Sequence, residues 1–228
     1  MIFWISSLAG LAVAYLLGAT PTGYLAGKWL KGVDIRTQGS GSTGATNVLR
    51  TLGPWPFGLV LLVDVVKGVA AIVVARWICH WLFQSPSVTP PVGLDRQSFG
   101  PWAVCLAGLA TLLGHSRSIW LKFTGGKSVA AGLGVLLAMA WPVGVGGLVV
   151  FGVVVAVFRI VSLGSILAAL TAIALVCVLP QPAAYRVFVI AGGVFVIVRH
   201  RANIQRLRAG VEPRLGQRPP RAATESRT

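Results

Sequence analysis

The sequence predicts an all-α integral membrane protein with seven transmembrane helices, its N-terminus outside and its C-terminus inside. Of the 228 residues, 55% are hydrophobic and 11% are charged, whereas a soluble domain carries about 25% charged residues. The mean hydropathy is +0.80. The chain has 20 lysines and arginines against five acidic residues. Most of these cations lie at the ends of hydrophobic runs, where membrane topology and anionic lipid headgroups account for them without nucleic acid.

Seven hydrophobic runs define the expected helices: about 2–27, 57–83, 100–114, 128–141, 143–158, 161–179 and 185–198. A perpendicular span needs about 20 residues, so the third, fourth and fifth runs must be tilted or must include polar flanks. The stretch 128–158 could form one long helix or a hairpin. Pro142, with the glycines that follow it, favours a break there.

The distribution of positive charge predicts the orientation. The segments 28–56, 115–127 and 199–228 hold most of the basic residues. One fused helix over 128–158 would put the second and third of these on opposite sides of the membrane, against the positive-inside rule. Seven spans put them on the same, cytoplasmic side, where we expect short re-entrant or interfacial segments such as 119–123.

The chain is expected to form one transmembrane domain, 1–209, followed by a basic tail, 210–228. The tail is rich in proline, arginine and small polar residues, a composition typical of disordered cytoplasmic extensions. The three cysteines are isolated within apolar runs, so neither a disulfide nor a metal site is predicted.

Four polar, glycine-containing segments fall on the predicted cytoplasmic side: 39–50, 114–134, 159–165 and 198–210. In the first, Gly39, Gly41 and Gly44 allow backbone N–H groups to converge on an anion. Short hydrogen-bonding side chains and a forked guanidinium add to its suitability for phosphate: Ser40, Ser42, Thr43, Thr46, Asn47 and Arg50. The alternative is a flexible linker, but four such segments on one side indicate a single anion-binding cleft.

In the second segment, Gly125, Gly126 and Lys127 lead directly into an apolar run. A glycine turn at a helix N-terminus is suited to phosphate, although the spacing does not fit a Walker A loop and the lysine could instead be an interfacial one. His115 lacks an aspartate five residues on, because position 120 is tryptophan. It is therefore either a helix-end histidine bonded to backbone or a residue of the site.

Two i, i+3 pairs lie in or beside the spans. Asp64 and Lys67 would share one face of the second helix, either as an ion pair that fixes helix packing or as substrate contacts. His200 and Asn203 could bind phosphate oxygens or cap the last span.

Taken in order, these motifs resemble those of the bacterial membrane acyl-phosphate:glycerol-3-phosphate acyltransferases, the PlsY family. GSGSTGATNVLR resembles the family's first motif, DVVKGVAA the helix after it, GHSRSIWLKFTGGKSVAAGLG the second motif, and RIVSLGS and RHRANIQRLRAG the later ones. The resemblance runs from about 18 to 212. It implies the seven-helix fold, and transfer of an acyl group from acyl phosphate to the 1-hydroxyl of glycerol 3-phosphate without a cofactor. The products would be lysophosphatidate and phosphate.

The motifs and the resemblance together give a set of site residues. We expect catalytic roles in phosphate binding for Ser40, Arg50, Lys127, His200 and Asn203. We expect substrate-binding roles for Gly39, Gly41, Thr43, Gly44, Asn47, His115, Gly125, Gly126, Ser162 and Ser165. The general base stays open between His115, His200 and the substrate's own phosphate. No metal is expected.

The resemblance also implies a monomer in the bacterial cytoplasmic membrane with its active site facing the cytoplasm. A soluble acyl-phosphate synthase would supply the acyl phosphate. The sequence departs from the family pattern at Ser42, at Ser116–Arg117–Ser118, at Ser128 and at Ala202.

Two rival classes fit less well. An organic-anion transporter would be expected to contain an inverted repeat, and none is evident. A CDP-alcohol phosphotransferase would need an aspartate-rich metal-binding helix, which five scattered acids do not supply.

Overall fold

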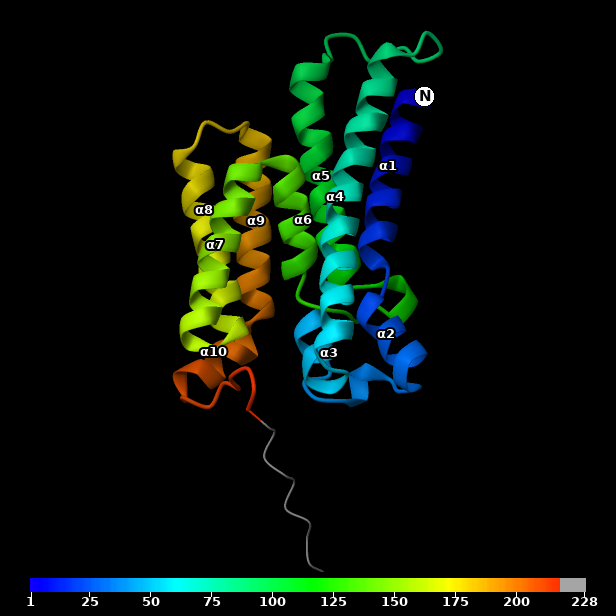
Figure 1. Ribbon diagram of the computed structural model, residues 1–228. Helices are drawn as coiled ribbons and strands as arrows, with labels where there is room; N and C mark the ends of the chain where they lie inside the picture. Colours follow the sequence, from blue (N-terminus) through cyan, green and yellow to red (C-terminus); the bar gives the residue numbers. More distant parts are fainter. Residues whose placement is uncertain (218–228) are drawn as a thin grey trace, which may run out of the picture.

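The computed structural model describes residues 1–217, which form a bundle of helices (Figure 1). Residues 218–228, within the predicted tail, lie outside the described residues. In chain order the elements are α1 (Ile2–Ala19), α2 (Thr22–Lys31), η1 (Ile35–Thr37), α3 (Ala45–Thr51), α4 (Pro54–Gln84), α5 (Arg96–Ser116), η2 (Ile119–Leu121), α6 (Val129–Met139), α7 (Trp141–Phe158), α8 (Val161–Val178), α9 (Ala183–Arg199) and α10 (Arg201–Arg208).

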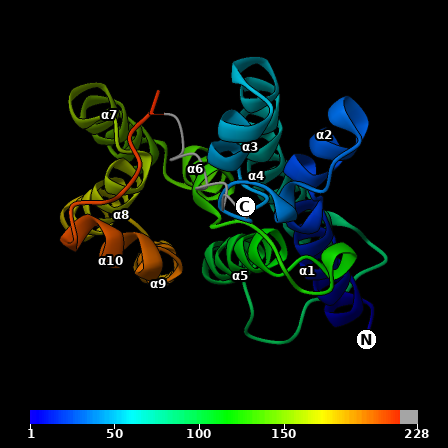
Figure 2. The same ribbon diagram turned by 90° about the horizontal axis from the view of Figure 1, so that it is seen from below.

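The long helices form two groups with α6 between them. Helices α1, α4 and α5 pack together on one side, and α7, α8 and α9 on the other (Figures 1 and 2). Helix α6 packs against α4 and α7, and α5 also touches α9. The short helices α2, α3 and α10 all lie at the end of the bundle opposite the N-terminus (Figure 1). The polar segments predicted to share one side of the membrane are therefore at one end of the fold.

Five helical segments among residues 1–217 are long and apolar enough to cross a membrane: Ile2–Lys31, Pro54–Gln84, Arg96–Ser116, Trp141–Phe158 and Val161–Val178. The bent pair α9 and α10, with an angle of 58° between them, makes a sixth if it counts as one span. Helix α6, with 11 residues, reaches about 16 Å at 1.5 Å per residue, short of the roughly 30 Å hydrocarbon core. The protein is thus an all-α, multi-pass membrane protein.

Each of the seven predicted runs contains one apolar helix, and the predicted break within 128–158 is present. Helix α6 ends at Met139 and α7 begins at Trp141, with Pro142 in its first turn. The first run differs from the prediction, because 2–27 is divided between α1 and α2 at Thr20 and Pro21. Proline lacks an N–H and clashes with the preceding turn, so the helix stops, and the Thr20 carbonyl accepts from the Thr22 N–H and from Lys67 Nζ.

Glycines allow the helix backbones to touch. A Cβ on Gly68 of α4 would lie 2.2 Å from the Ala131 carbonyl oxygen, and one on Gly134 of α6 would lie 2.0 Å from the Val65 oxygen. The same reciprocal contact joins α1 to α5 through Gly18 and Gly114. Small residues at such crossings are typical of membrane helix pairs, and they hold α6 firmly against α4.

Candidate active site

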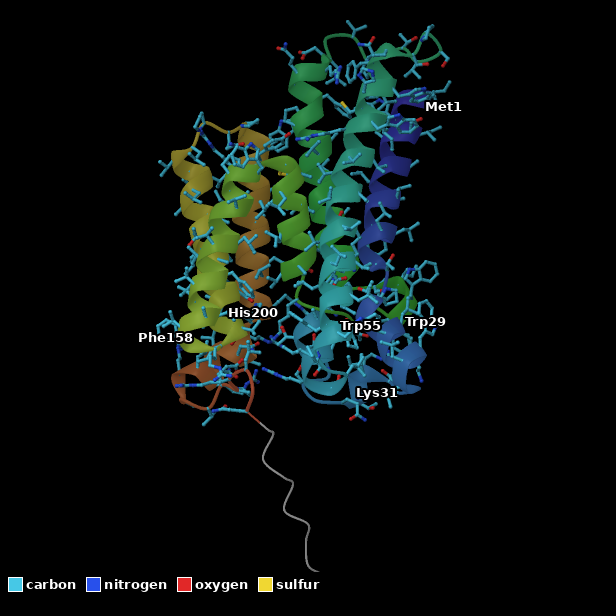
Figure 3. The ribbon with its side chains drawn as sticks, viewed as in Figure 1. Met1, Trp29, Lys31, Trp55, Phe158 and His200 are labelled. Carbon is cyan, nitrogen blue, oxygen red and sulfur yellow. The ribbon has the colours of Figure 1, made fainter. Side chains whose placement is uncertain are left out.

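A cavity of about 480 Å³ lies between the two groups of helices, within the range of small-molecule sites. Its wall along α6 to α9 is apolar and includes Leu136, Phe151, Ala172 and Phe188. Its other end is polar and lies near His200, where α9 turns into α10 (Figure 3). The structure brings ten of the predicted site residues to this cavity: Ser40, Gly44, Asn47, Arg50, His115, Lys127, Ser162, Ser165, His200 and Asn203.

The other five predicted residues do not line the cavity. Thr43 and Gly125 line a small pocket beside it. Gly39 and Gly41 shape the 39–50 loop with positive φ values of 55° and 69°. Gly126 lies against the His115 ring, where a Cβ would come within 2.3 Å of Nε2.

Lys127 is held at the polar end by a chain of hydrogen bonds. Its Nζ donates to Asn203 Oδ1 at 2.6 Å, and Asn203 Nδ2 donates to Glu212 Oε1 at 2.6 Å. Burial lowers the pKa of Lys127 to about 8, against the opposing effect of the Glu212 charge, and the nearby arginines Arg206 and Arg50 lower it further. The amine therefore changes charge close to physiological pH.

Glu212 is a site residue that the sequence did not predict. Burial alone would raise its pKa, but hydrogen bonds from Asn203, Ser162 and Arg206 outweigh burial and hold the pKa below its usual value. The Ser162 and Arg206 bonds are both 2.7 Å long. By sequence this carboxylate belongs to the expected tail, and only its contacts with distant residues distinguish it from the basic stretch around it.

The segment 210–217 folds back onto the bundle. Besides Glu212, the Leu215 N–H donates to the Arg159 carbonyl at 2.7 Å. This part of the expected tail therefore makes specific contacts, and only 218–228 lies outside the described residues.

Asn47 organises the 39–50 loop. Its Nδ2 donates to the carbonyls of Ile35, Gln38 and Ser42 at 2.9–3.1 Å, and its Oδ1 accepts from the Ser40 N–H at 2.9 Å. A Cβ on Gly39 would lie 2.3 Å from this Oδ1, so the loop requires glycine there. Although Asn47 borders the cavity, its side chain is occupied in holding the backbone.

Ser40 and Arg50 lie at the same edge, and their side chains make no hydrogen bond within residues 1–217. Both are exposed and line the cavity, and α3 carries Arg50 in its last turn. They are therefore available to bind an anion.

Asp64 and Lys67 form the predicted ion pair inside α4, with Nζ 2.8 Å from Oδ1 and both side chains buried. The Thr22 hydroxyl donates to Asp64, and Lys67 Nζ donates to the Thr20 carbonyl at 2.9 Å. The pair thus ties α4 to the break between α1 and α2. Asp64 also lines the cavity, so the same carboxylate holds the helices together and borders the site.

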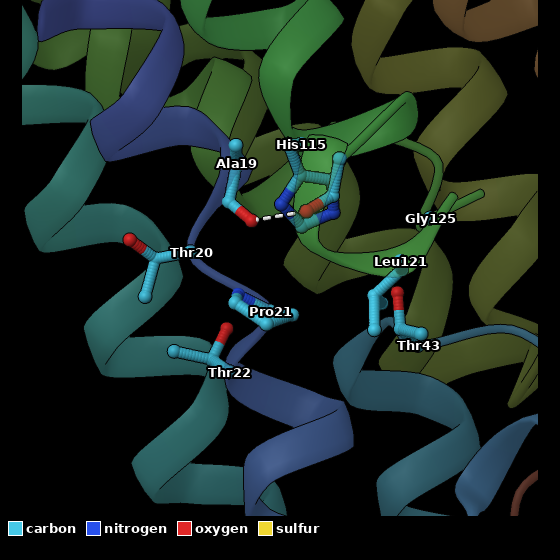
Figure 4. A pocket seen from close by; sticks show the side chains of 9 residues that line it. Ala19, Thr20, Pro21, Thr22, Thr43, His115, Leu121 and Gly125 are labelled. Atoms are coloured by element: carbon cyan, nitrogen blue, oxygen red, sulfur yellow. Dashed lines mark hydrogen bonds between the residues drawn. The ribbon is translucent and has the colours of Figure 1, made fainter. Parts of the chain in front are cut away.

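His115 lies next to this pair. Its Nδ1 is 3.8 Å from Asp64 Oδ1 and, within residues 1–217, has no hydrogen-bond partner. The ring borders a small pocket of about 10 Å³ together with Thr22 and Thr43, as Figure 4 shows. At the same pocket, Ser118 Oγ donates to the Ala19 carbonyl. The backbone bond considered for His115 is therefore absent at Nδ1.

His200 has a defined orientation. Its Nδ1 lies 2.7 Å from the Val196 carbonyl oxygen, which can only accept, so Nδ1 carries the proton. The other ring nitrogen, Nε2, is then an acceptor, and His200 lines the cavity. Within the part of the chain that the structure describes, no group of three or more His, Cys, Asp or Glu residues is placed to hold a metal ion.

The sequence matches the family model for glycerol-3-phosphate acyltransferase over residues 8–210. The chain belongs to this family. Glycerol-3-phosphate acyltransferase 2 of Rhizobium johnstonii is 69% identical over 217 residues, covering 95% of this chain and 99% of the relative. The glycerol-3-phosphate acyltransferase of Trichormus variabilis is 55% identical, covering 94% of this chain and 95% of the relative.

Solved structures of PlsY (YgiH), an integral membrane glycerol 3-phosphate acyltransferase, share the fold. The glycerol 3-phosphate form has a TM-score of 0.80 and 37% identity, covering 92% of this chain and 96% of that one. The lysophosphatidic acid form has a TM-score of 0.77 and 36% identity with the same coverage. The predicted resemblance of this chain to the PlsY family is thereby confirmed.

Proposed function

We propose that the protein transfers a fatty acyl group from acyl phosphate to the 1-hydroxyl of glycerol 3-phosphate, giving lysophosphatidate and phosphate. The amphiphilic cavity carries this proposal. Cationic side chains, Arg50, Lys127 and Arg206, line its polar end, and apolar side chains of α6 to α9 line the rest. An acyl phosphate has the same division between a charged head and a long apolar chain.

Phosphate groups would bind at the polar end. Arg50 offers a planar fork for two phosphate oxygens, while Lys127 offers a point charge beside the N-terminus of α6. Ser40 and Asn203 add donors around them, whereas the Ser165 hydroxyl already donates to the Val161 carbonyl and the second ring nitrogen of His200 is an acceptor. Membership of a glycerol-3-phosphate acyltransferase family, and the glycerol 3-phosphate form of PlsY, support glycerol 3-phosphate as the acceptor.

The reaction needs little chemical activation, because acyl phosphate is a mixed anhydride. The glycerol hydroxyl oxygen forms the new ester bond to the acyl carbon, and the bond from that carbon to the phosphate oxygen breaks. The phosphate leaves with the electron pair, and the cations stabilise it. The hydroxyl proton goes to His115, to His200 or to a substrate phosphate.

The acyl chain would lie along α6 and α7, where glycines keep the wall of the cavity open. Gly132, Gly144 and Gly147 all border it. We further infer that the seven apolar helices lie across a bacterial cytoplasmic membrane with the N-terminus outside, α6 passing through only part of its thickness, so that α2, α3 and α10 face the cytoplasm. There a soluble acyl-phosphate synthase would deliver the donor to the monomeric enzyme.

A direct assay tests this function. Purified protein in detergent receives glycerol 3-phosphate with either acyl phosphate or acyl-CoA, and lysophosphatidate and released phosphate are measured. We expect turnover with acyl phosphate alone, undiminished by EDTA. Transfer only from acyl-CoA would contradict the donor assignment, and loss on chelation that Mg²⁺ restores would contradict the metal-free mechanism.

A further inference from the structure

A second group of cations lies outside the cavity, at the end of the bundle where α5 stops and α9 turns into α10. Its members are Arg117, Arg199 and Arg201, and none of them lines the cavity. Every acidic residue among 1–217 is engaged elsewhere: Asp34 with Arg36, Asp64 with Lys67, Glu212 with Arg206, and Asp95 at the N-terminus of α5, at the far end of that helix. This arginine cluster thus has no acidic partner in the described part of the chain.

Two of the arginines are fixed to one loop. Arg117 Nη1 donates to the Phe123 carbonyl at 3.4 Å, and Arg199 Nη2 donates to the Gly126 carbonyl at 3.1 Å. The positive charges of Arg117 and Arg201 repel that of Arg199. The Arg199 Nε is buried and has no hydrogen-bond partner among residues 1–217. A guanidinium has five N–H donors, and the side chains of Arg117 and Arg201 are exposed, so N–H donors of this cluster can reach an anion at the surface.

The surroundings of the cluster are those of a membrane interface. On the loop, Trp120 is 63% exposed and Phe123 is 56% exposed, as expected of aromatic side chains at the level of lipid headgroups. Leu113 on α5, one turn before Arg117, and Val198 on α9, directly before Arg199, are also exposed. An anion bound here would have apolar helix surface beside it.

We propose that this arginine cluster binds the phosphate of an anionic phospholipid headgroup from the leaflet on this side of the membrane. Forked guanidinium groups match phosphate oxygens, and basic pockets between membrane helices are suited to such headgroups. The acyl chains would lie on the exposed faces of α5 and α9. This site is separate from the catalytic cavity and does not depend on the proposed acyl transfer.

The site has a physical link to the cavity. Arg199 holds the Gly126 carbonyl, and the next residue, Lys127, reaches into the cavity to Asn203. A headgroup that accepts hydrogen bonds from the remaining Arg199 donors would hold the loop on its membrane side. Lys127 of the same loop points to the cavity on the other side. Lipid binding is therefore expected to favour the loop conformation that positions Lys127.

Native mass spectrometry of the purified full-length protein tests the proposal. The protein is equilibrated in detergent with equal amounts of phosphatidylglycerol and phosphatidylcholine, and the bound lipids are counted. We expect one phosphatidylglycerol to be retained in preference to phosphatidylcholine, with a loss of about fivefold in Arg117→Gln and a further loss when Arg201→Gln is added. Arg117→Lys, which keeps the charge, should lose less.

Matched controls lie at the other ends of the same helices. Arg96→Gln on α5 and Arg186→Gln on α9 should retain the wild-type preference. Unchanged phosphatidylglycerol retention in the Arg117 and Arg201 variants would overturn the proposal. Displacement of the lipid by millimolar inorganic phosphate would also overturn it, because the site would then take a free phosphate.

Discussion

At the scale of single residues, Lys127 makes the activity depend on pH. Its amine binds anions only when protonated, and burial brings its pKa down to about 8. The value of kcat/KM for glycerol 3-phosphate should therefore fall as pH rises through about 8, since this parameter reports the free enzyme. Initial rates measured from about pH 7 to about pH 9.5 check the prediction.

The matched variant for this titration is Lys127→Arg. An arginine stays protonated throughout this range, so the variant should lose the fall above pH 8 even if its overall rate is lower. A wild-type decline that persists unchanged in Lys127→Arg would assign the titration to another group.

The contribution of Arg50 to activity should depend on the planar shape of its guanidinium as well as on its charge. It lines the cavity from the last turn of α3, and lysine cannot reproduce two parallel hydrogen bonds to phosphate. Arg50→Lys should therefore lower kcat/KM at least tenfold, equal to about 1.4 kcal/mol. Arg186→Lys, at the far end of α9, is the control in the same assay. An Arg50→Lys enzyme as active as this control would exclude a bidentate contact between Arg50 and phosphate.

Other residue roles followed from the local pattern only in part. The position of Ser40, Arg50 and Lys127 at the cavity could be predicted because the motif itself places them beside a loop or helix end, whereas the Ser165 hydroxyl bonds the Val161 carbonyl of its own helix. Asn47 has the same type of side chain, yet it turns inward and bonds three carbonyls of its own loop. Sequence spacing does not distinguish a free amide from one that already has partners.

At the scale of elements, the segment after α10 stabilises the site by linking two helices. Glu212 accepts hydrogen bonds from Ser162, Asn203 and Arg206 and so joins α8 to α10. Replacing it by alanine leaves Arg206 and Asn203 without their acceptor, which should cost about 3 kcal/mol of stability. Glu212→Ala should melt at a lower temperature in detergent and lose activity. Gln217→Ala is the control and should do neither. A Glu212→Ala protein with wild-type melting temperature and activity would show that Glu212 does not stabilise the site.

The crossing of α4 and α6 is a second element-scale test. A Cβ on Gly134 would lie 2.0 Å from the Val65 oxygen, whereas one on Gly152 of α7 meets nothing within 4 Å. Gly134→Ala must therefore push the helices apart, at a cost of about 1–3 kcal/mol, and Gly152→Ala should be nearly neutral. Thermal melting of both variants in detergent makes the comparison, and equal melting temperatures would show that the crossing tolerates a side chain.

At the scale of the whole molecule, hydrophobic runs and charge predicted most of the architecture. Each run contains a helix, because apolar length is a local property of the sequence. The predicted gathering of polar segments at one end also appears in the fold (Figure 1). What local pattern could not predict is contact between distant segments, such as Asp64 beside His115, or Glu212 beside Ser162.

The orientation in the membrane is the remaining whole-molecule prediction, and single cysteines can test it. Cys177 is exposed, so it must first be replaced by serine, whereas Cys79 and Cys105 are buried. In that background, Val92→Cys, at a fully exposed position in the loop before α5, should react with a membrane-impermeant maleimide added to intact cells. Gln38→Cys and Gln217→Cys, exposed at the opposite end of the bundle, should react only after the cells are opened. Because the positive-inside rule places both basic ends together, labelling of Gln38→Cys and Gln217→Cys from opposite sides would rule out seven spans.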